Sequence, residues 1–109
     1  MADIGIIKFQ LAQMDFCMYA DPILEIVRYT GVRRIPNPLP YVVGIIELRH
    51  HIVTVVDLRK RIGLLSLPFT PNTVMIVATL SSGTYGILVD MISDFRRKCP
   101  AETLSRHHI

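Results

Sequence analysis

The stretch Pro36–Gly63, PNPLPYVVGIIELRHHIVTVVDLRKRIG, carries the clearest structural pattern in this 109-residue chain. Its first five residues hold three prolines, which fix φ and keep the backbone extended. Two apolar runs, the second of them mostly β-branched at 52–56, flank a polar patch at 47–51. This pattern predicts a strand, a polar turn and a second strand. The charged segment 57–61 that follows is compatible with the start of a short helix closed by Gly63.

Upstream of this hairpin, the sequence predicts a second hairpin at the amino end. Residues 6–12 (IIKFQLA) alternate between apolar and polar side chains, as in a strand with one face in water. A turn is expected at 13–15, followed by a short strand at 16–19.

A short helix is predicted between these two hairpins. Asp21 is a typical N-cap, and Pro22 suits the first helical position. The apolar residues of 23–27 recur at helical spacing, and Gly31 stands where a helix commonly ends.

Downstream of Gly63, the chain predicts a loop and then two or three further strands. Loop 64–71 exposes Leu65, Leu67 and Phe69, which need either a groove of their own fold or a partner. The near-continuous apolar run 73–80 predicts a central strand, and a return strand is expected at 84–89 after a Ser-Ser-Gly turn. Residues 91–95 continue with Ile92 able to pack.

Composition is that of one folded domain. Half of the residues are apolar and 19% are charged, which excludes a disordered chain. The apolar runs are too short to span a membrane, and the N-terminus lacks the features of a signal peptide. Cys17 and Cys99 have no metal-ligand spacing, so we interpret them as reduced thiols of a cytoplasmic protein, with a disulfide as the alternative. About seven short strands and one short helix predict an all-β barrel or a pair of small barrels.

The sequence gives no positive reason to expect an enzyme. It contains no GxSxG, SxxK, Walker-A or GxGxxG pattern. Histidines occur as two adjacent pairs, His50-His51 and His107-His108. Because adjacent residues on a strand face opposite ways, neither pair can chelate one metal alone. We therefore predict no catalysis, no cofactor and no metal.

Charged residues in apolar surroundings suggest structural roles. Asp57 and Asp90 each follow a β-branched run and are interpreted as caps that accept backbone N–H groups at strand ends. Glu25 and Arg49 form a candidate ion pair. If both are buried, removing one would strongly destabilise the fold; if they are exposed, the pair contributes little.

Several short motifs occur in the order typical of one family. The matching pieces are Glu25-Ile26, Pro36-Asn37 with Pro40, Gly44-Ile45-Ile46, Leu48-Arg49, VVDLR at 55–59, and Gly86 with Val89-Asp90. Over residues 6–100 the chain thus resembles the CheW-like domain of bacterial chemotaxis. The segment 101–109 is expected to be a mobile tail.

The resemblance implies an all-β fold of two small SH3-like β-barrels with a groove between them. It also implies a cytoplasmic, non-catalytic adaptor that couples methyl-accepting chemoreceptors to a CheA-type histidine kinase. The regulatory domain of the kinase would bind by barrel-to-barrel pairing, and the helical tip of the receptor would dock in the groove. The protein would neither bind nucleic acid nor insert into a membrane.

The resemblance also assigns roles to individual residues. Glu25 and Arg49 correspond to a structural ion pair. The partner-binding positions are Val32, Arg33, Arg34, Ile35, Pro36, Asn37, Pro40, Val42, Val43, Asp57, Arg59, Val89 and Asp90.

The chain departs from the family pattern in two respects. Glu47, His50 and Thr54 replace Asn, Gly and Pro, and losing the glycine is expected to change the turn at 49–51. The family also continues with further strands, so we expect the second barrel to be incomplete with an unpaired strand edge. A partner strand or a strand-exchanged homodimer would cover that edge.

Two other functions compete with the adaptor hypothesis. A small barrel could bind single-stranded nucleic acid, for which Tyr29 near Arg28, Arg33 and Arg34 is the only candidate platform. A metal protein or enzyme is supported only by the histidines.

Overall fold

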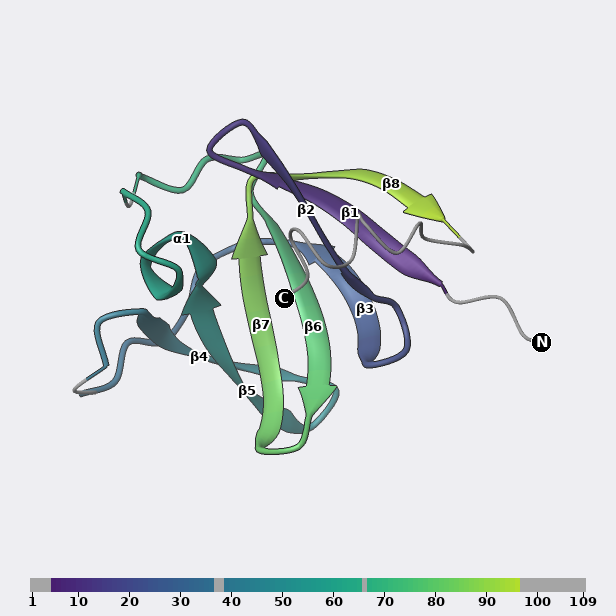
Figure 1. Ribbon diagram of the computed structural model, residues 1–109. Coiled ribbons are helices and arrows are strands. Elements are labelled where there is room, and N and C mark those ends of the chain that lie inside the picture. The colour runs from purple at the N-terminus through teal and green to yellow at the C-terminus, as the bar shows by residue number, and fades with distance from the viewer. Residues whose placement is uncertain (1–4, 37–38, 66, 97–109) are drawn as a thin grey trace.

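The computed structural model describes residues 5–36, 39–65 and 67–96, apart from the side chains of residues 95 and 96. These residues form eight strands and one short helix in two sheets (Figure 1). The three-stranded sheet has the order β2 (Met14–Tyr19), β1 (Ile6–Leu11), β8 (Met91–Arg96). The five-stranded sheet has the order β3 (Ile23–Arg28), β6 (Val74–Leu80), β7 (Gly83–Val89), β5 (His51–Asp57), β4 (Val42–Leu48). Helix α1 (Leu58–Arg61) follows β5. The predicted all-β class is confirmed, and the short helix of the described residues is α1 at 58–61, not the helix expected after Asp21.

The predicted central hairpin is β4 paired antiparallel with β5, from Ile45 opposite Thr54 to Leu48 opposite His51. Its two-residue turn has positive φ at both central positions, 50° at Arg49 and 68° at His50. Such values are typical of a type I′ turn, whose twist suits a hairpin. The turn thus takes the left-handed backbone without the family glycine, at the steric cost that a side chain incurs there.

The predicted helix between Asp21 and Gly31 is wrong, because residues 23–28 form strand β3. Exposure alternates along β3, with Leu24 and Ile26 outward and Val27 packed inward. A helix of two turns is weak by itself, since nucleation is costly. Antiparallel pairing with β6 satisfies this backbone instead. Gly31 does not end a helix. It lies after β3 and has a φ of 113°, a value that favours glycine.

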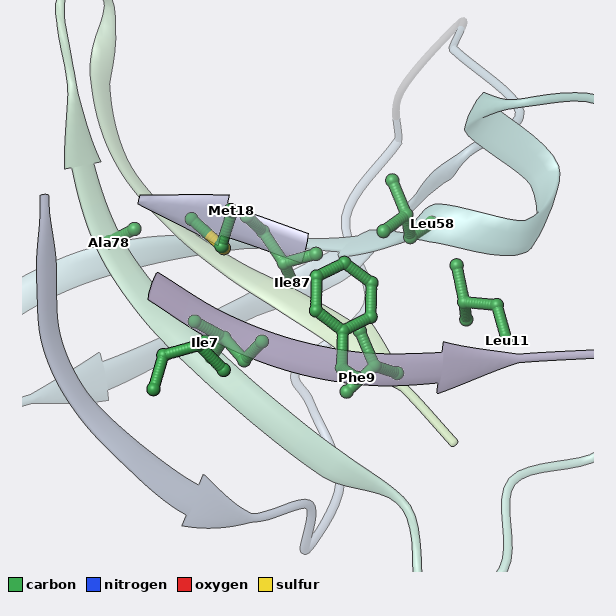
Figure 2. Packing of buried hydrophobic residues seen from close by; sticks show 9 residues of the cluster. Ile7, Phe9, Leu11, Met18, Leu58, Ala78 and Ile87 are labelled. Carbon is green, nitrogen blue, oxygen red and sulfur yellow. The ribbon is translucent and has the colours of Figure 1, made fainter. Parts of the chain in front are cut away.

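The first core lies between the two sheets and is built on alternate residues of β1, β6 and β7. Phe9 is fully buried, and Ile76 and Ile87 face it from the five-stranded sheet. Figure 2 shows Ile7, Phe9 and Leu11 along β1 among the other members of this cluster. The expected packing of Ile92 is confirmed, since it contacts this core from β8.

The second core lies on the opposite face of the five-stranded sheet. Its buried members are Val53, Val55, Met75, Val77 and Leu88. Strands β3 and β4, the two edges of the sheet, add partly buried residues to the same core. All five strands therefore contribute, and the sheet curls around this core. Because β6 and β7 are buried on both faces, their sequences are apolar without a polar alternation.

The segment after β3 lies close against β4. Arg33 and Ile45 exchange two backbone hydrogen bonds of 2.8 Å, which form an isolated bridge. Gly44 makes this approach possible, because a Cβ atom there would lie 2.4 Å from the Arg33 carbonyl oxygen. The predicted extended piece at 32–35 is thus held on the edge strand of the hairpin.

Replacing His50 by glycine should raise the free energy of unfolding by about 1 kcal/mol, because glycine adopts positive φ without steric cost. Urea denaturation followed by circular dichroism measures the change. His51→Gly is the matched control, since His51 lies within β5. There glycine should lower stability by about 0.5–1 kcal/mol. Equal losses at both positions would contradict the turn assignment.

Candidate protein-binding site

Asp90 joins the two sheets at the point where β7 passes into β8. Its carboxylate oxygen Oδ2 accepts a hydrogen bond of 2.9 Å from the backbone N–H of Ala12, in the turn after β1. Its own N–H donates to the carbonyl of Gln10 at 3.0 Å. The predicted capping role of Asp90 is therefore confirmed. Asp57 likewise caps α1, where its Oδ1 accepts from the N–H of Arg59 at 3.1 Å.

Arg59 reaches the same carboxylate from the five-stranded sheet. Its Nε donates to Oδ1 of Asp90 at 3.1 Å, and its Nη2 donates to Oδ2. Its side chain is only 13% exposed. This two-pronged ion pair was missed at the sequence level, where each residue was considered alone. Arg59 is the last residue of the segment VVDLR, and Asp90 is the last residue of ILVD. A charged residue of opposite sign after each apolar strand was the feature of the sequence that could have suggested a pair.

The structure brings Glu25 and Arg49 together, with Arg49 Nε 2.6 Å from Glu25 Oε2. The pair connects β3 to the turn between β4 and β5, so it links the two edges of the five-stranded sheet. The hydrogen bond with Glu25 raises the pKa of Arg49. The Arg49 side chain is nevertheless 77% exposed, whereas that of Glu25 is 22% exposed. We therefore expect the contribution of this pair to stability to be that of a surface pair.

The thirteen positions assigned to partner binding by resemblance differ in exposure. Arg34, Ile35, Pro36 and Pro40 are exposed, whereas Asn37 lies outside the described residues. The less exposed positions are the buried Asp57 and Val89, the partly buried Val32, Val42 and Val43, and the paired Arg59 and Asp90. Arg33 is exposed but bridged to β4. Among the assigned positions that the structure describes, the exposed ones therefore lie in or next to the proline arm.

An open groove of about 550 Å³ lies beside this arm, between segment 30–33 and the outer face of the β4–β5 hairpin. Ile45 and Ile52 supply its apolar wall, and Ile52 is 60% exposed. Arg33 and Glu47 place one positive and one negative charge on the lining. A groove with an apolar wall and charges of both signs suits a protein segment.

The candidate nucleic-acid platform is not available as a stacking surface. Tyr29 is partly buried, packs against the second core and meets Phe69 edge-on, with ring centroids 5.0 Å apart. Base stacking needs an open aromatic face. The described part of the chain therefore does not favour oligonucleotide binding.

The described residues hold no group of three or more His, Cys, Asp and Glu side chains placed to share a metal ion. His50 and His51 are both exposed at the β4–β5 turn. Cys17 is buried as a free thiol. Cys99, His107, His108 and the expected tail lie outside the described residues. No helix within 5–36, 39–65 and 67–96 is long and apolar enough to cross a membrane.

The described residues thus form a two-sheet β domain with an exposed arm and an adjoining groove. Residues 5–105 match the family model of the CheW-like domain. The chain is 34% identical over 89 residues to the chemotaxis protein CheW of Rhizobium meliloti (strain 1021), covering 82% of this chain and 57% of that protein. It is 33% identical over 86 residues to CheW of Klebsiella aerogenes, covering 79% and 52% of the two chains.

A solved structure gives the same result. The crystal structure of the scaffolding protein TtCheW from Thermoanaerobacter tengcongensis matches with a TM-score of 0.81 at 26% identity, over 90% of this chain and 66% of that one. The chain therefore belongs to the CheW-like domain family. It spans little more than half the length of the curated relatives that it matches.

Asp90→Ala should lower the free energy of unfolding by about 2 kcal/mol, since it leaves the largely buried Arg59 and the Ala12 N–H without their acceptor. Urea denaturation measures this change. Asp15→Ala is the matched control, because the Lys8–Asp15 pair at 3.6 Å involves a half-exposed aspartate. That control should change stability by less than about 1 kcal/mol. A loss at Asp90 no larger than at Asp15 would refute the structural role of the joint.

Proposed function

We propose that this protein is a chemotaxis adaptor that couples methyl-accepting chemoreceptors to a CheA-type histidine kinase by protein–protein binding, without catalysis. The match of residues 5–105 to the CheW-like family carries the proposal. Related proteins in Rhizobium meliloti and Bacillus subtilis bear the name chemotaxis protein CheW. The proposal places the protein in the cytoplasm, where the kinase and the receptor tips are expected.

Within this function, we assign one partner contact to the exposed arm. Arg34, Ile35, Pro36 and Pro40 present both charge and apolar surface beside the 550 Å³ groove. The prolines lower the conformational freedom that the arm loses on binding. Ile35, at 37% exposure, and Leu39, at 46%, are the large apolar side chains that the arm exposes, and we assign the contact to Ile35, which lies next to the groove-lining segment 30–33.

Homodimerisation also belongs to the proposal. Among the strands that the structure describes, β8 stands at one edge of the three-stranded sheet. A strand of a second copy, or of the kinase domain, could add to such an edge through main-chain hydrogen bonds. Light scattering of the purified chain over a range of concentrations measures whether a dimer forms. A mass that stays that of the monomer at all concentrations would refute the homodimer.

The coupling function is tested by capture on an immobilised CheA-type regulatory domain and, separately, on a receptor cytoplasmic fragment. The unaltered chain should bind both. Ile35→Asp should weaken binding to at least one of them by about tenfold, since a charge in a buried contact is costly. Leu80→Asp, at an exposed apolar residue near the β6–β7 turn, is the matched control and should bind within about twofold of the unaltered chain.

Failure of the unaltered chain to bind either partner would refute the adaptor function. Equal losses for Ile35→Asp and Leu80→Asp would instead refute the placement of the contact on the arm. Circular dichroism of each variant checks that the fold is retained.

A further inference from the structure

We propose that a second docking site, for an acidic amphipathic segment of a protein partner, lies on α1 and the loop that follows it. We name this the α1–β6 surface. Its residues are Lys60, Arg61, Ile62, Leu65, Leu67 and Phe69. None of these residues belongs to the arm, but the cavity beside them is lined in part by Asp57, Arg59, Val89 and Asp90, which the resemblance assigns to partner binding. The proposal therefore rests on the protein-binding function proposed above and adds a second contact and its chemistry to it.

The loop exposes apolar side chains without burying them in its own fold. Leu65 is 77% exposed, and Leu67 is 47% exposed. Neighbouring residues hold the loop in place: Leu64 packs against the first core, and Phe69 contacts Tyr29. Arg59 Nη1 also donates to the carbonyl of Leu65 at 3.4 Å. The apolar side chains are therefore presented outward from an anchored loop, which is typical of a binding surface.

A cavity of about 240 Å³ opens beside these side chains. Leu67, Pro68 and Phe69 line one part of it, and the buried Leu88 and Val89 line another. This space can accept an apolar side chain from a partner. A partner that inserts an anchoring residue into a preformed pocket gains most of its affinity there.

The charges around this surface are positive. Lys60 and Arg61 lie exposed in the last turn of α1, next to the start of the loop. Burial raises the pKa of the Tyr29 phenol, which contacts Phe69, and the positive charge of Arg34 opposes that rise. The cavity itself is lined by two carboxylates, that of Asp57, which caps α1, and that of Asp90, which is paired with Arg59. An acidic partner is thus electrostatically complementary.

The cavity favours a protein segment over an anionic bilayer as the occupant. A pocket is matched by a side chain held at a fixed position, as on one face of a helix, whereas a bilayer presents none. The apolar face of an amphipathic helix would cover Leu65 and Leu67, and its acidic flank would lie near Lys60.

The test uses the full chain and a fluorescent synthetic helix with leucines on one face and glutamates on the other. Fluorescence anisotropy should show saturable binding. A matched helix with lysines in place of glutamates should bind about tenfold more weakly, and Lys60→Glu should weaken binding of the acidic helix by a similar factor. Leu65→Ser should also weaken it, whereas Leu80→Ser should leave it unchanged.

Absence of saturable binding would overturn this proposal, as would equal effects of Leu65→Ser and Leu80→Ser. Binding to phosphatidylglycerol vesicles that Leu65→Ser abolishes, without binding to the acidic helix, would overturn it in favour of a membrane contact. Ile35→Asp should bind the acidic helix like the unaltered chain. Failure of this proposal and failure of the coupling function therefore give different results.

Discussion

The arrangement of the two sheets depends on the hydrogen bonds and the ion pair that the Asp90 carboxylate makes. It accepts from Ala12 in the three-stranded sheet's hairpin turn and from Arg59 at the end of the five-stranded sheet. Strand β5 pairs parallel with β7, and Asp57 stands opposite Leu88. Two residues after Asp57 and two residues after Leu88, the side chains of Arg59 and Asp90 contact each other. The ion pair thus follows directly after the end of the parallel strand pairing, with Arg59 in the first turn of α1 and Asp90 just after β7. A partly buried, two-pronged contact of this kind fixes orientation as well as distance.

Strands β6 and β7 extend this constraint through the interior. Their odd and even residues belong to different cores, with Ile76 in the first and Met75 and Val77 in the second. A shift of one residue in either strand would exchange the two sets, so the register is strongly specified. Because β7 leads directly to Asp90, the register that fills both cores also positions the joint between the sheets.

Local patterns were enough to predict the hairpins, the caps and the short helix after β5, because turn chemistry and β-branched runs act within a few residues. The same reasoning failed at β3. Asp21-Pro22 and the spacing of Ile23 and Ile26 favour a helix locally, but the backbone of this segment pairs with β6, some fifty residues away. The Arg59–Asp90 pair was missed for a related reason: a parallel pairing of β5 with β7 leaves no local signal. Of the residues assigned by resemblance, sequence alone could not separate the exposed arm from internal positions such as Val89 and Asp57, because burial follows from the tertiary packing.

The charged side chains that pair within the fold also determine which charges are left exposed to a partner. Arg59 is paired inside the joint, and Arg49 is paired with Glu25 at the rim of the curled sheet. Arg34 and Lys60 are exposed and form no salt bridge with any residue that the structure describes. A charge already held by an internal carboxylate adds little to the attraction of a partner, whereas an exposed one can steer it. Part of the exposed positive charge of the described residues thus lies in the arm, at Arg34, and before the apolar loop, at Lys60, where exposed apolar side chains are also found.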